Sequence, residues 1–213
     1  MADRDWHLLP QGGVYWPDQQ MLLVADLHLG KDATFRSASI GVPRGSTQGT
    51  LQSLSDMLAC CDARELVILG DLFHARSSLS KETIHDFESW LGRHAKLEMT
   101  LVRGNHDRHV GHLPSRWGLS IIEESLNIDR VLLTHVPTAC SEGNDLVIAG
   151  HLHPADVVTV GGESTGKLPC FWLNQGCLTL PACGQFTGTA KIRRQPNDQV
   201  WLIADDRVVP RPR

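Results

Sequence analysis

The sequence predicts an α/β protein, because short apolar runs alternate with helix-like segments through the first half of its 213 residues and strand-like runs dominate the second half. Hydrophobic residues make up 41% of the chain, which is enough apolar material to build a core. We therefore expect one globular domain over residues 1–213, with a disordered tail at residues 210–213.

Five apolar runs have the length of buried strands. They cover residues 21–25, 66–69, 97–102, 131–133 and 146–149. Nearly continuous apolar runs of this kind are typical of strands with both faces covered. Further strands are predicted after residue 135, between glycine and proline turns, at residues 156–160, 170–173, 177–180 and 199–204.

Two helices are predicted between the early strands. The first covers residues 47–61, with leucines at helical spacing and Ser46 as a candidate cap. The second covers residues 81–92, where an apolar stripe follows Ser80, whose hydroxyl can cap the first turn.

Composition narrows the class of partner. The formal net charge is −4, so the chain lacks the globally basic surface that governs nonspecific binding to duplex DNA. No stretch approaches the roughly 18 consecutive apolar residues of a membrane span, and residues 1–13 contain no apolar signal region. Six cysteines form no Cys-x-x-Cys pair. We expect a cytoplasmic protein with reduced cysteines and no membrane partner.

Residues of the types that commonly bind metal ions follow each of the five early apolar runs. In chain order the motifs are Asp26-Leu27-His28, Gly70-Asp71, Gly104-Asn105-His106-Asp107, His135 and Gly150-His151-Leu152-His153. Side chains converge at the carboxyl ends of strands in an open α/β sheet, so residues far apart in the chain can meet there. Carboxylate and imidazole ligands suit manganese, iron or zinc. Together the motifs describe a site for two divalent metal ions.

In this order the motifs resemble those of the calcineurin-like metallophosphoesterases, whose pattern D-x-H, G-D, G-N-H-D/E, H and G-H-x-H is matched without a gap. The resemblance implies a four-layer αββα sandwich, in which helices flank two mixed sheets. It also implies that Asp71 bridges two metal ions. One ion would then be held by Asp26, His28 and His153, and the other by Asn105, His135 and His151.

The same resemblance implies phosphoester hydrolysis. A water that bridges two such ions loses a proton near neutral pH and can attack phosphorus in line. His106 adjoins a ligand but lies outside the ligand set, and the family pattern gives it the role of stabilising the phosphoryl charge or protonating the leaving oxygen. For Asp107 two roles stay open, an acceptor that orients His106 or an aspartate that stabilises a turn.

Segments outside the metal motifs resemble the bacterial DNA ligase-associated metallophosphoesterases, which are small proteins assigned to DNA repair. These segments are residues 30–36, 42–47, 70–74 and 178–188. The likeness implies a nucleic-acid phosphodiester substrate, single-stranded DNA or RNA, with a DNA ligase and a helicase as partners. We expect manganese at the two metal positions, with iron or zinc as alternatives. Candidate substrate contacts beside the motifs are Arg36, Arg44, His74 and Arg108, for which solvated surface positions are the alternative.

Other functions stay open at this point. The same metal pair can hydrolyse a small phosphodiester or a pyrophosphate, and a protein of this fold can act as a noncatalytic scaffold. A protein phosphatase is disfavoured, because Leu72-Phe73-His74 follows Gly70-Asp71 where those phosphatases continue Val-Asp-Arg-Gly. The sequence also shows no obvious platform of aromatic residues interleaved with basic ones, which single-strand binders commonly use.

Overall fold

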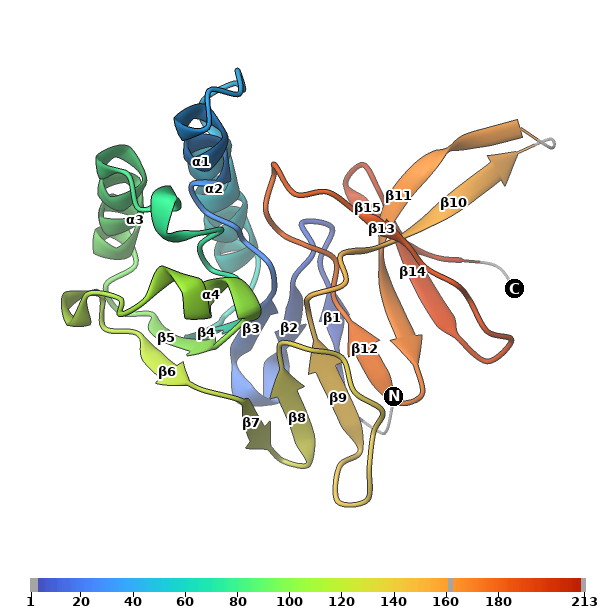
Figure 1. Ribbon diagram of the computed structural model, residues 1–213. Coiled ribbons are helices and arrows are strands. Elements are labelled where there is room, and N and C mark those ends of the chain that lie inside the picture. The colour runs from blue at the N-terminus through green and yellow to red at the C-terminus, as the bar shows by residue number, and fades with distance from the viewer. Residues whose placement is uncertain (1–3, 161–162, 212–213) are drawn as a thin grey trace.

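The structure, a computed structural model, describes residues 4–160 and 163–211 (Figure 1). Among these residues the first sheet has six strands in the order β1-β2-β3-β4-β5-β6. Their bounds are β1 His7–Leu8, β2 Val14–Trp16, β3 Met21–Val24, β4 Glu65–Leu69, β5 Glu98–Val102 and β6 Ser120–Ile122. Strands β3 to β6 run parallel, so the carboxyl ends of β3, β4 and β5 lie along one edge of the sheet.

The second sheet has nine strands in the described residues. Its path runs β13-β10-β11-β12-β9-β8-β7, with β14 beside β11 and β15 beside β14. The bounds are β7 Ser125–Ile128, β8 Val131–Thr134, β9 Leu146–Ala149, β10 Pro154–Val160, β11 Glu163–Asn174, β12 Cys177–Thr179, β13 Ala190–Lys191, β14 Gln199–Ala204 and β15 Arg207–Pro210. Strands β8 and β9 are parallel neighbours, so their carboxyl ends also lie together.

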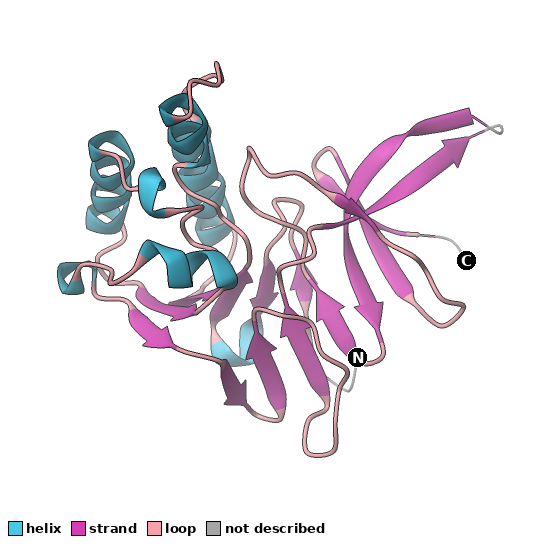
Figure 2. Cartoon of the chain, in the orientation of Figure 1, coloured by secondary structure: helices cyan, strands magenta, loops and turns pink. Residues whose placement is uncertain are grey.

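Helices occur only among the connections of the first sheet, within the part of the chain that the structure describes (Figure 2). They are α1 Lys31–Ser37, α2 Ser46–Ala59, α3 Lys81–Arg93 and α4 Asn105–Val110, with 3₁₀ turns η1 Pro17–Gln19, η2 Arg76–Ser78 and η3 Ser115–Trp117. None of these described helices is long and apolar enough to cross a bilayer.

The α/β class and the two packed mixed sheets are confirmed, while the described helices form one outer layer, over the first sheet. In the second sheet a loop of residues 135–145 makes the crossover between parallel β8 and β9, where a helix is the usual connection. The outer apolar cluster of that sheet, which includes Val147 and Cys177, packs against Leu132 and Cys140.

Side chains of β3 alternate between two apolar layers, as the period of an extended strand requires. Leu22 lies in the cluster that contains Leu54 of α2 and Phe87 of α3. Leu23 lies in the cluster that contains Ile148 and Phe171 of the second sheet. The first sheet is therefore buried on both faces, which explains its continuous apolar runs.

The helix ends and the tail differ in part from the sequence-based expectations. Ser80 caps α3 as expected, since its hydroxyl accepts a hydrogen bond from the Thr83 N–H. Ser46 is not a cap, because it is the first residue of α2 and Gly45, with a left-handed φ of 98°, precedes it. The tail prediction is wrong for residues 210 and 211, because Pro210 ends β15 and the Arg211 N–H donates to Val200 O. Residues 212–213 lie outside the described residues.

The short elements were not predicted, because helices of six or seven residues such as α1 and α4 carry too few apolar positions to show a period. The expected reduced state of the cysteines fits six free thiols. Cys170, Cys177 and Cys183 are buried in three separate apolar clusters.

Replacing Ser80 by alanine removes the side-chain acceptor for the Thr83 N–H. We expect the free energy of unfolding to fall by about 1 kcal/mol, as measured by urea denaturation followed by circular dichroism. Ser80→Asp retains an acceptor and should keep most of that stability. An alanine variant as stable as the parent protein would show that this cap contributes nothing.

Candidate metal centre

The two sheets bring their polar strand ends together at one place. Asp26 and His28 follow β3, Asp71 follows β4, and Asn105 opens α4 directly after β5. The second sheet contributes residues that follow β8 and β9, namely His135, His151 and His153. All seven sequence-predicted ligands therefore lie at the carboxyl ends of parallel strands.

Three of these residues face one another on one side of Asp71. His153 Nε2 lies 3.2 Å from Asp26 Oδ1 and 3.4 Å from His28 Nε2. His28 Nε2 in turn lies 3.8 Å from Asp71 Oδ2. Asp26, His28 and His153 have donor atoms that are all within 4.8 Å of one another, which is close enough to surround a single cation.

A second group faces the other oxygen of Asp71. His135 Nε2 lies 2.9 Å from Asn105 Oδ1, 3.1 Å from His151 Nδ1 and 3.6 Å from Asp71 Oδ1. The two carboxylate oxygens of Asp71 thus point into different donor groups. A carboxylate in this position can bridge two ions about 3.5 to 4 Å apart.

Backbone carbonyls determine which ring nitrogen of two histidines faces inward. His135 Nδ1 lies 2.9 Å from Leu69 O, and His153 Nδ1 lies 3.0 Å from Gly188 O. A carbonyl oxygen can only accept, so Nδ1 donates to it in both rings and Nε2 is the ring nitrogen that faces the centre. This orientation leaves Nε2 as the ring nitrogen available to a metal ion.

The two carboxylates of the centre are buried, and burial shifts the ionisation of groups around them. Asp26 is 0% and Asp71 2% exposed. Burial raises the pKa of the Asp71 carboxyl, and the nearby Asp26 carboxylate adds to the rise. Burial, together with the charges of neighbouring histidines, lowers the pKa of His28 to about 2. His28 is therefore neutral at physiological pH, as a ligand must be.

The loops that carry these side chains adopt an uncommon backbone conformation. Five of the seven candidate ligands are non-glycine residues with a positive φ: Asp26 (55°), His28 (45°), Asp71 (56°), His151 (72°) and His153 (49°). Such conformations cost free energy and persist only where the surroundings enforce them, which is typical of functional sites.

Asp26 provides a direct test of whether a cation fits. Its Oδ2 accepts a hydrogen bond from the His151 N–H at 2.8 Å, but its buried Oδ1 has no such N–H donor among the described residues, and the ring nitrogen that faces it is His153 Nε2 at 3.2 Å. A buried anionic oxygen without a donor carries a large desolvation cost. A divalent ion between Asp26 and the inward-facing histidine nitrogens would remove that cost, so the donor set fits a metal.

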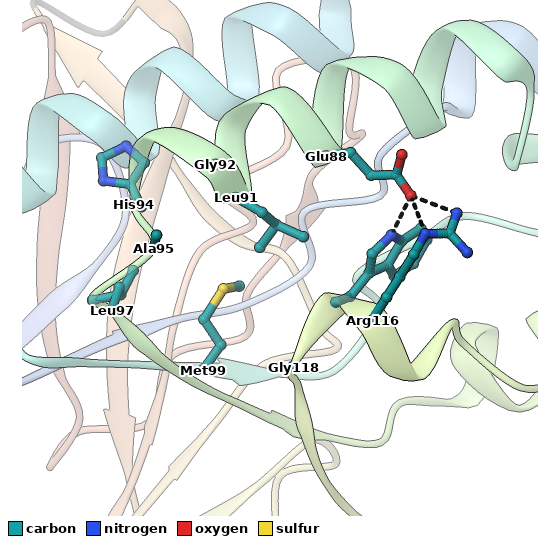
Figure 3. Close-up of a pocket in the computed structure, with 10 residues that line it drawn as sticks. Glu88, Leu91, Gly92, His94, Ala95, Leu97, Met99, Arg116 and Gly118 are labelled. Carbon is teal, nitrogen blue, oxygen red and sulfur yellow. Dashed lines mark hydrogen bonds and ion pairs between the residues drawn. The ribbon is translucent and has the colours of Figure 1, made fainter.

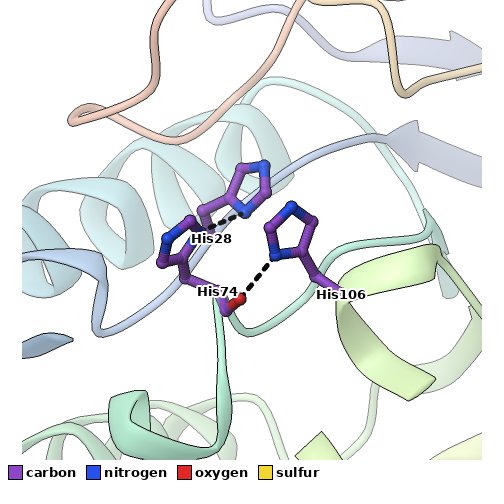
Figure 4. Close-up of side chains that lie close together, drawn as sticks. All are labelled: His28, His74 and His106. Atoms are coloured by element: carbon purple, nitrogen blue, oxygen red, sulfur yellow. Dashed lines mark hydrogen bonds between the residues drawn. The ribbon is translucent and has the colours of Figure 1, made fainter. Parts of the chain in front are cut away.

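His106 and His74 extend the cluster (Figure 4). His106 Nδ1 donates to the backbone oxygen of His74 at 2.6 Å, and the two rings stack with centroids 4.8 Å apart. His106 Nε2 lies 3.9 Å from Asp71 Oδ2, so the nitrogen opposite the carbonyl contact faces the centre. His74 Nδ1 lies 3.3 Å from His28 Nδ1. Of the four predicted substrate contacts, His74 is the one that touches the cluster.

Asp107 does not orient His106, because the acceptor for His106 Nδ1 is the His74 carbonyl. The buried Asp107 carboxylate instead accepts hydrogen bonds from the backbone N–H groups of Asp71 (2.8 Å), Leu72 (3.0 Å) and Gly104 (2.9 Å). It therefore ties the second and third motifs together, which agrees with the alternative of a turn-stabilising aspartate.

Comparison with known proteins identifies the family. The sequence profile described as calcineurin-like phosphoesterase matches residues 20–151, well over half of the chain. The chain belongs to this family. A search of curated proteins finds no match.

A solved structure shares both the fold and much of the sequence. The nuclease MPE from Pseudomonas putida is 34% identical, with a TM-score of 0.84 over 98% of this chain and 96% of that chain. Two other structures are more distant. A protein of unknown function from Aquifex aeolicus is 19% identical (TM-score 0.43, covering 62% of this chain and 78% of that chain). A predicted phosphoesterase from Streptococcus pneumoniae TIGR4 is 15% identical (TM-score 0.35, covering 87% and 83%).

The predicted arginine contacts of this calcineurin-like phosphoesterase lie outside the cluster. Arg36 donates to buried Asp32 at 2.8 Å, which gives it a structural partner on α1. Arg44 lies 3.7 Å from Glu82, and Arg108 is exposed on α4.

One basic residue beside the cluster was missed in the sequence. Burial is the main cause that lowers the pKa of His74 to about 4, and the charge of Lys31 adds to that effect. The charge of Lys31 also lowers the pKa of His28, and the Lys31 backbone N–H donates to His28 O. Its position three residues after His28 pointed to the site in the sequence, but the candidate residues were chosen as metal ligands and lysine was not among them.

A cavity of about 520 Å³ lies away from the centre, between α3 and β5 (Figure 3). Glu88 at its rim accepts hydrogen bonds from Arg116 and from the Trp117 ring N–H. Met99, which lines it, is near the amino end of β5, whereas Asn105 follows the carboxyl end. The cavity and the metal centre therefore lie at opposite ends of this strand.

Two glycines test how tightly the centre is packed. A Cβ atom at Gly104 would overlap Asp71 Oδ1, whereas one at Gly92 in α3 meets nothing within 4 Å. We expect Gly104→Ala to lower the free energy of unfolding by about 1–3 kcal/mol. Gly92→Ala, the matched control, should raise it by about 0.5–1 kcal/mol. Thermal and urea denaturation measure both, and equal effects would contradict close packing around Asp71.

Proposed function

We propose that this protein is a phosphodiesterase that uses two divalent metal ions and cleaves nucleic acid. The observation that carries the proposal is the sharing of Asp71, whose two oxygens face separate groups of donors at 3.8 Å and 3.6 Å. Asp26, His28 and His153 would hold one ion, and Asn105, His135 and His151 the other. We propose manganese for both positions, with iron or zinc as alternatives, because the nitrogen and oxygen ligands suit all three.

The mechanism follows from the ligand geometry. When bound, the metal pair would supply a nucleophilic water at neutral pH and neutralise the phosphoryl oxygens. Asn105 contributes a neutral carbonyl oxygen, which limits the negative charge that an anionic substrate meets. Lys31 adds positive charge beside the same group of side chains. The site would thus attract a phosphodiester and stabilise the extra negative charge of its transition state.

His106 is the proposed proton donor to the leaving oxygen. Its Nδ1 donates a hydrogen bond to the His74 carbonyl oxygen, which orients the ring so that Nε2 faces the centre. Protonated Nε2 can give its proton to the departing alkoxide. His74, stacked on His106, is proposed to contact the substrate from the same side.

The proposed substrate is a single-stranded nucleic acid, DNA before RNA. The support is the 34% identity, over almost the whole chain, to a structure described as a nuclease. Arg44 and Arg108 are exposed and remain proposed contacts for flanking phosphates, as does Arg36. We also propose a role in DNA repair in the cytoplasm, with a DNA ligase and a helicase as partners, on the resemblance of residues 30–36 and 178–188 to the ligase-associated group.

Asp71→Asn tests the shared ligand. Asparagine keeps the size of the side chain and one oxygen to accept the His106 N–H, so the protein should stay folded. It offers a single oxygen and no charge, so we expect fewer than two bound ions per chain and hydrolysis at background level. Metal analysis after dialysis and the rate with bis-p-nitrophenyl phosphate measure these effects.

Asp205→Asn is the matched control, because Asp205 is an exposed turn residue between β14 and β15. Chelation followed by added manganese should restore hydrolysis in this control and in the parent protein. Unchanged activity in Asp71→Asn would show that Asp71 is not a ligand shared by two metal ions.

His106→Ala tests the proton donor through the leaving group. A DNA alkoxide needs protonation as it leaves, so kcat for DNA should fall by about 10²–10⁴-fold. p-Nitrophenolate leaves without a proton, so kcat for its diester should fall much less. His109→Ala on the same helix, which is exposed, is the control. Equal losses on both substrates would argue against proton donation.

Activity on a panel of substrates separates the remaining functions. We expect manganese-dependent hydrolysis of bis-p-nitrophenyl phosphate to exceed that of p-nitrophenyl phosphate, together with cutting of single-stranded DNA. Diester hydrolysis without DNA cutting would favour a small phosphodiester or pyrophosphate as substrate. A lack of metal-dependent turnover on every substrate would favour the noncatalytic scaffold.

A further inference from the structure

A row of aromatic rings leads outward from the candidate metal centre. The row begins at His106, on which His74 stacks with ring centroids 4.8 Å apart. The Phe35 ring of α1 lies 6.3 Å from His74. Phe186, from a loop far along the chain, lies 5.8 Å from Phe35 at an interplanar angle of 74°. Neither phenylalanine belongs to the metal motifs.

Phe186 is an exposed aromatic residue on a loop whose backbone is hydrogen-bonded to the rest of the protein. The residue is 37% exposed, one of the few large apolar residues at the surface of the described chain. The loop that carries it, orange-red in Figure 1, is hydrogen-bonded on two sides. The Gly184 N–H donates to the backbone oxygen of Asp26 at 3.1 Å, and the Gln185 N–H donates to Thr50 Oγ1 of α2 at 3.1 Å. The backbone just before Phe186 is therefore tied to the centre and to α2.

We propose that Phe186, supported from the side by Phe35, is a stacking site for an unpaired nucleobase next to the phosphodiester held at the metal centre. This inference rests on the proposed nuclease function and assigns to it the residues that recognise the base. It also proposes the basis of selectivity. Bases inside a duplex are stacked on their neighbours, so only an unpaired base can offer its face to Phe186.

The position of the rings favours a base over other apolar partners. A base is separated from its phosphate by one sugar, and Phe186 lies two residues after Gly184, whose N–H is bonded to the backbone of the candidate ligand Asp26. A stable protein interface needs about 800 Å² on each partner, far more than two phenyl rings provide. Every base has an aromatic face, so the site would bind single strands with little sequence preference.

The proposed contact between Phe186 and the base is tested by combining one change in the protein with one change in the oligonucleotide. The protein is compared with Phe186→Ala, and a single-stranded oligonucleotide is compared with the same strand carrying one abasic position, moved stepwise along the strand. For the parent protein, removing the base beside the cut should lower kcat/KM by roughly tenfold or more. Phe186→Ala should lose a similar factor on the intact strand and become insensitive to base removal.

Further variants distinguish the effect of losing an aromatic face from the effects of losing apolar volume and of damaging the fold. Phe186→Trp keeps an aromatic face and should retain cleavage, whereas Phe186→Leu keeps bulk alone and should behave like Phe186→Ala. Val209→Ala, which removes an exposed apolar side chain on β15, is the control and should match the parent. Thermal denaturation and bound manganese of each variant report whether the fold and the centre are intact.

The outcomes distinguish the two proposals. If the parent and Phe186→Ala lose the same factor on base removal, or if Phe186→Leu cleaves as well as Phe186→Trp, the stacking site is overturned and the nuclease function stands. Equal cleavage of duplex and single strands by the parent overturns the proposed selectivity. If the parent hydrolyses bis-p-nitrophenyl phosphate but cuts no strand, the proposed nuclease function itself fails, and the stacking site fails with it.

Discussion

The burial of two carboxylates beside inward-facing imidazole nitrogens is the constraint on which the rest of the structure depends. Asp26 and Asp71 are almost fully buried, and within the described residues the basic side-chain nitrogens within 4 Å of their carboxylates belong to histidines. Burying a charge is costly unless hydrogen bonds or counter-charges compensate for it. Backbone N–H groups supply part of the compensation, and a pair of divalent cations would supply the rest.

The loops around the centre are built to meet that constraint. Left-handed backbone at Asp26, Asp71 and His151 would be unstable in an isolated loop, but each of these residues follows a strand whose end is fully buried. Asp107 adds a second restraint, because its carboxylate receives N–H groups from both Asp71 and Gly104. Strain at the candidate ligands is thus held in place by the packing and hydrogen bonds behind them.

Contacts between the two sheets complete the centre. The His135 ring hydrogen-bonds to Leu69 O, and the His151 N–H donates to Asp26 Oδ2, so each sheet positions side chains of the other. The loop of Phe186 repeats this pattern, because Gly184 is bonded to the backbone of Asp26. The apolar layer that contains Leu23 and Ile148 sets the spacing of the sheets. The candidate metal centre and the row of aromatic rings both depend on that layer.

The sequence by itself determined the strands that carry the motifs and the set of candidate ligands, because apolar periodicity and ligand chemistry are local properties. It could not decide between two roles for Asp107, because the answer lies in N–H groups of Asp71 and Leu72, more than thirty residues away in the chain. Nor could it predict the aromatic row, since Phe35 and Phe186 meet only after both sheets have packed. Which ring nitrogen of His135 faces inward was likewise decided by a carbonyl of the other sheet. Such long-range contacts depend on the packing of distant strands, which no single stretch of sequence encodes.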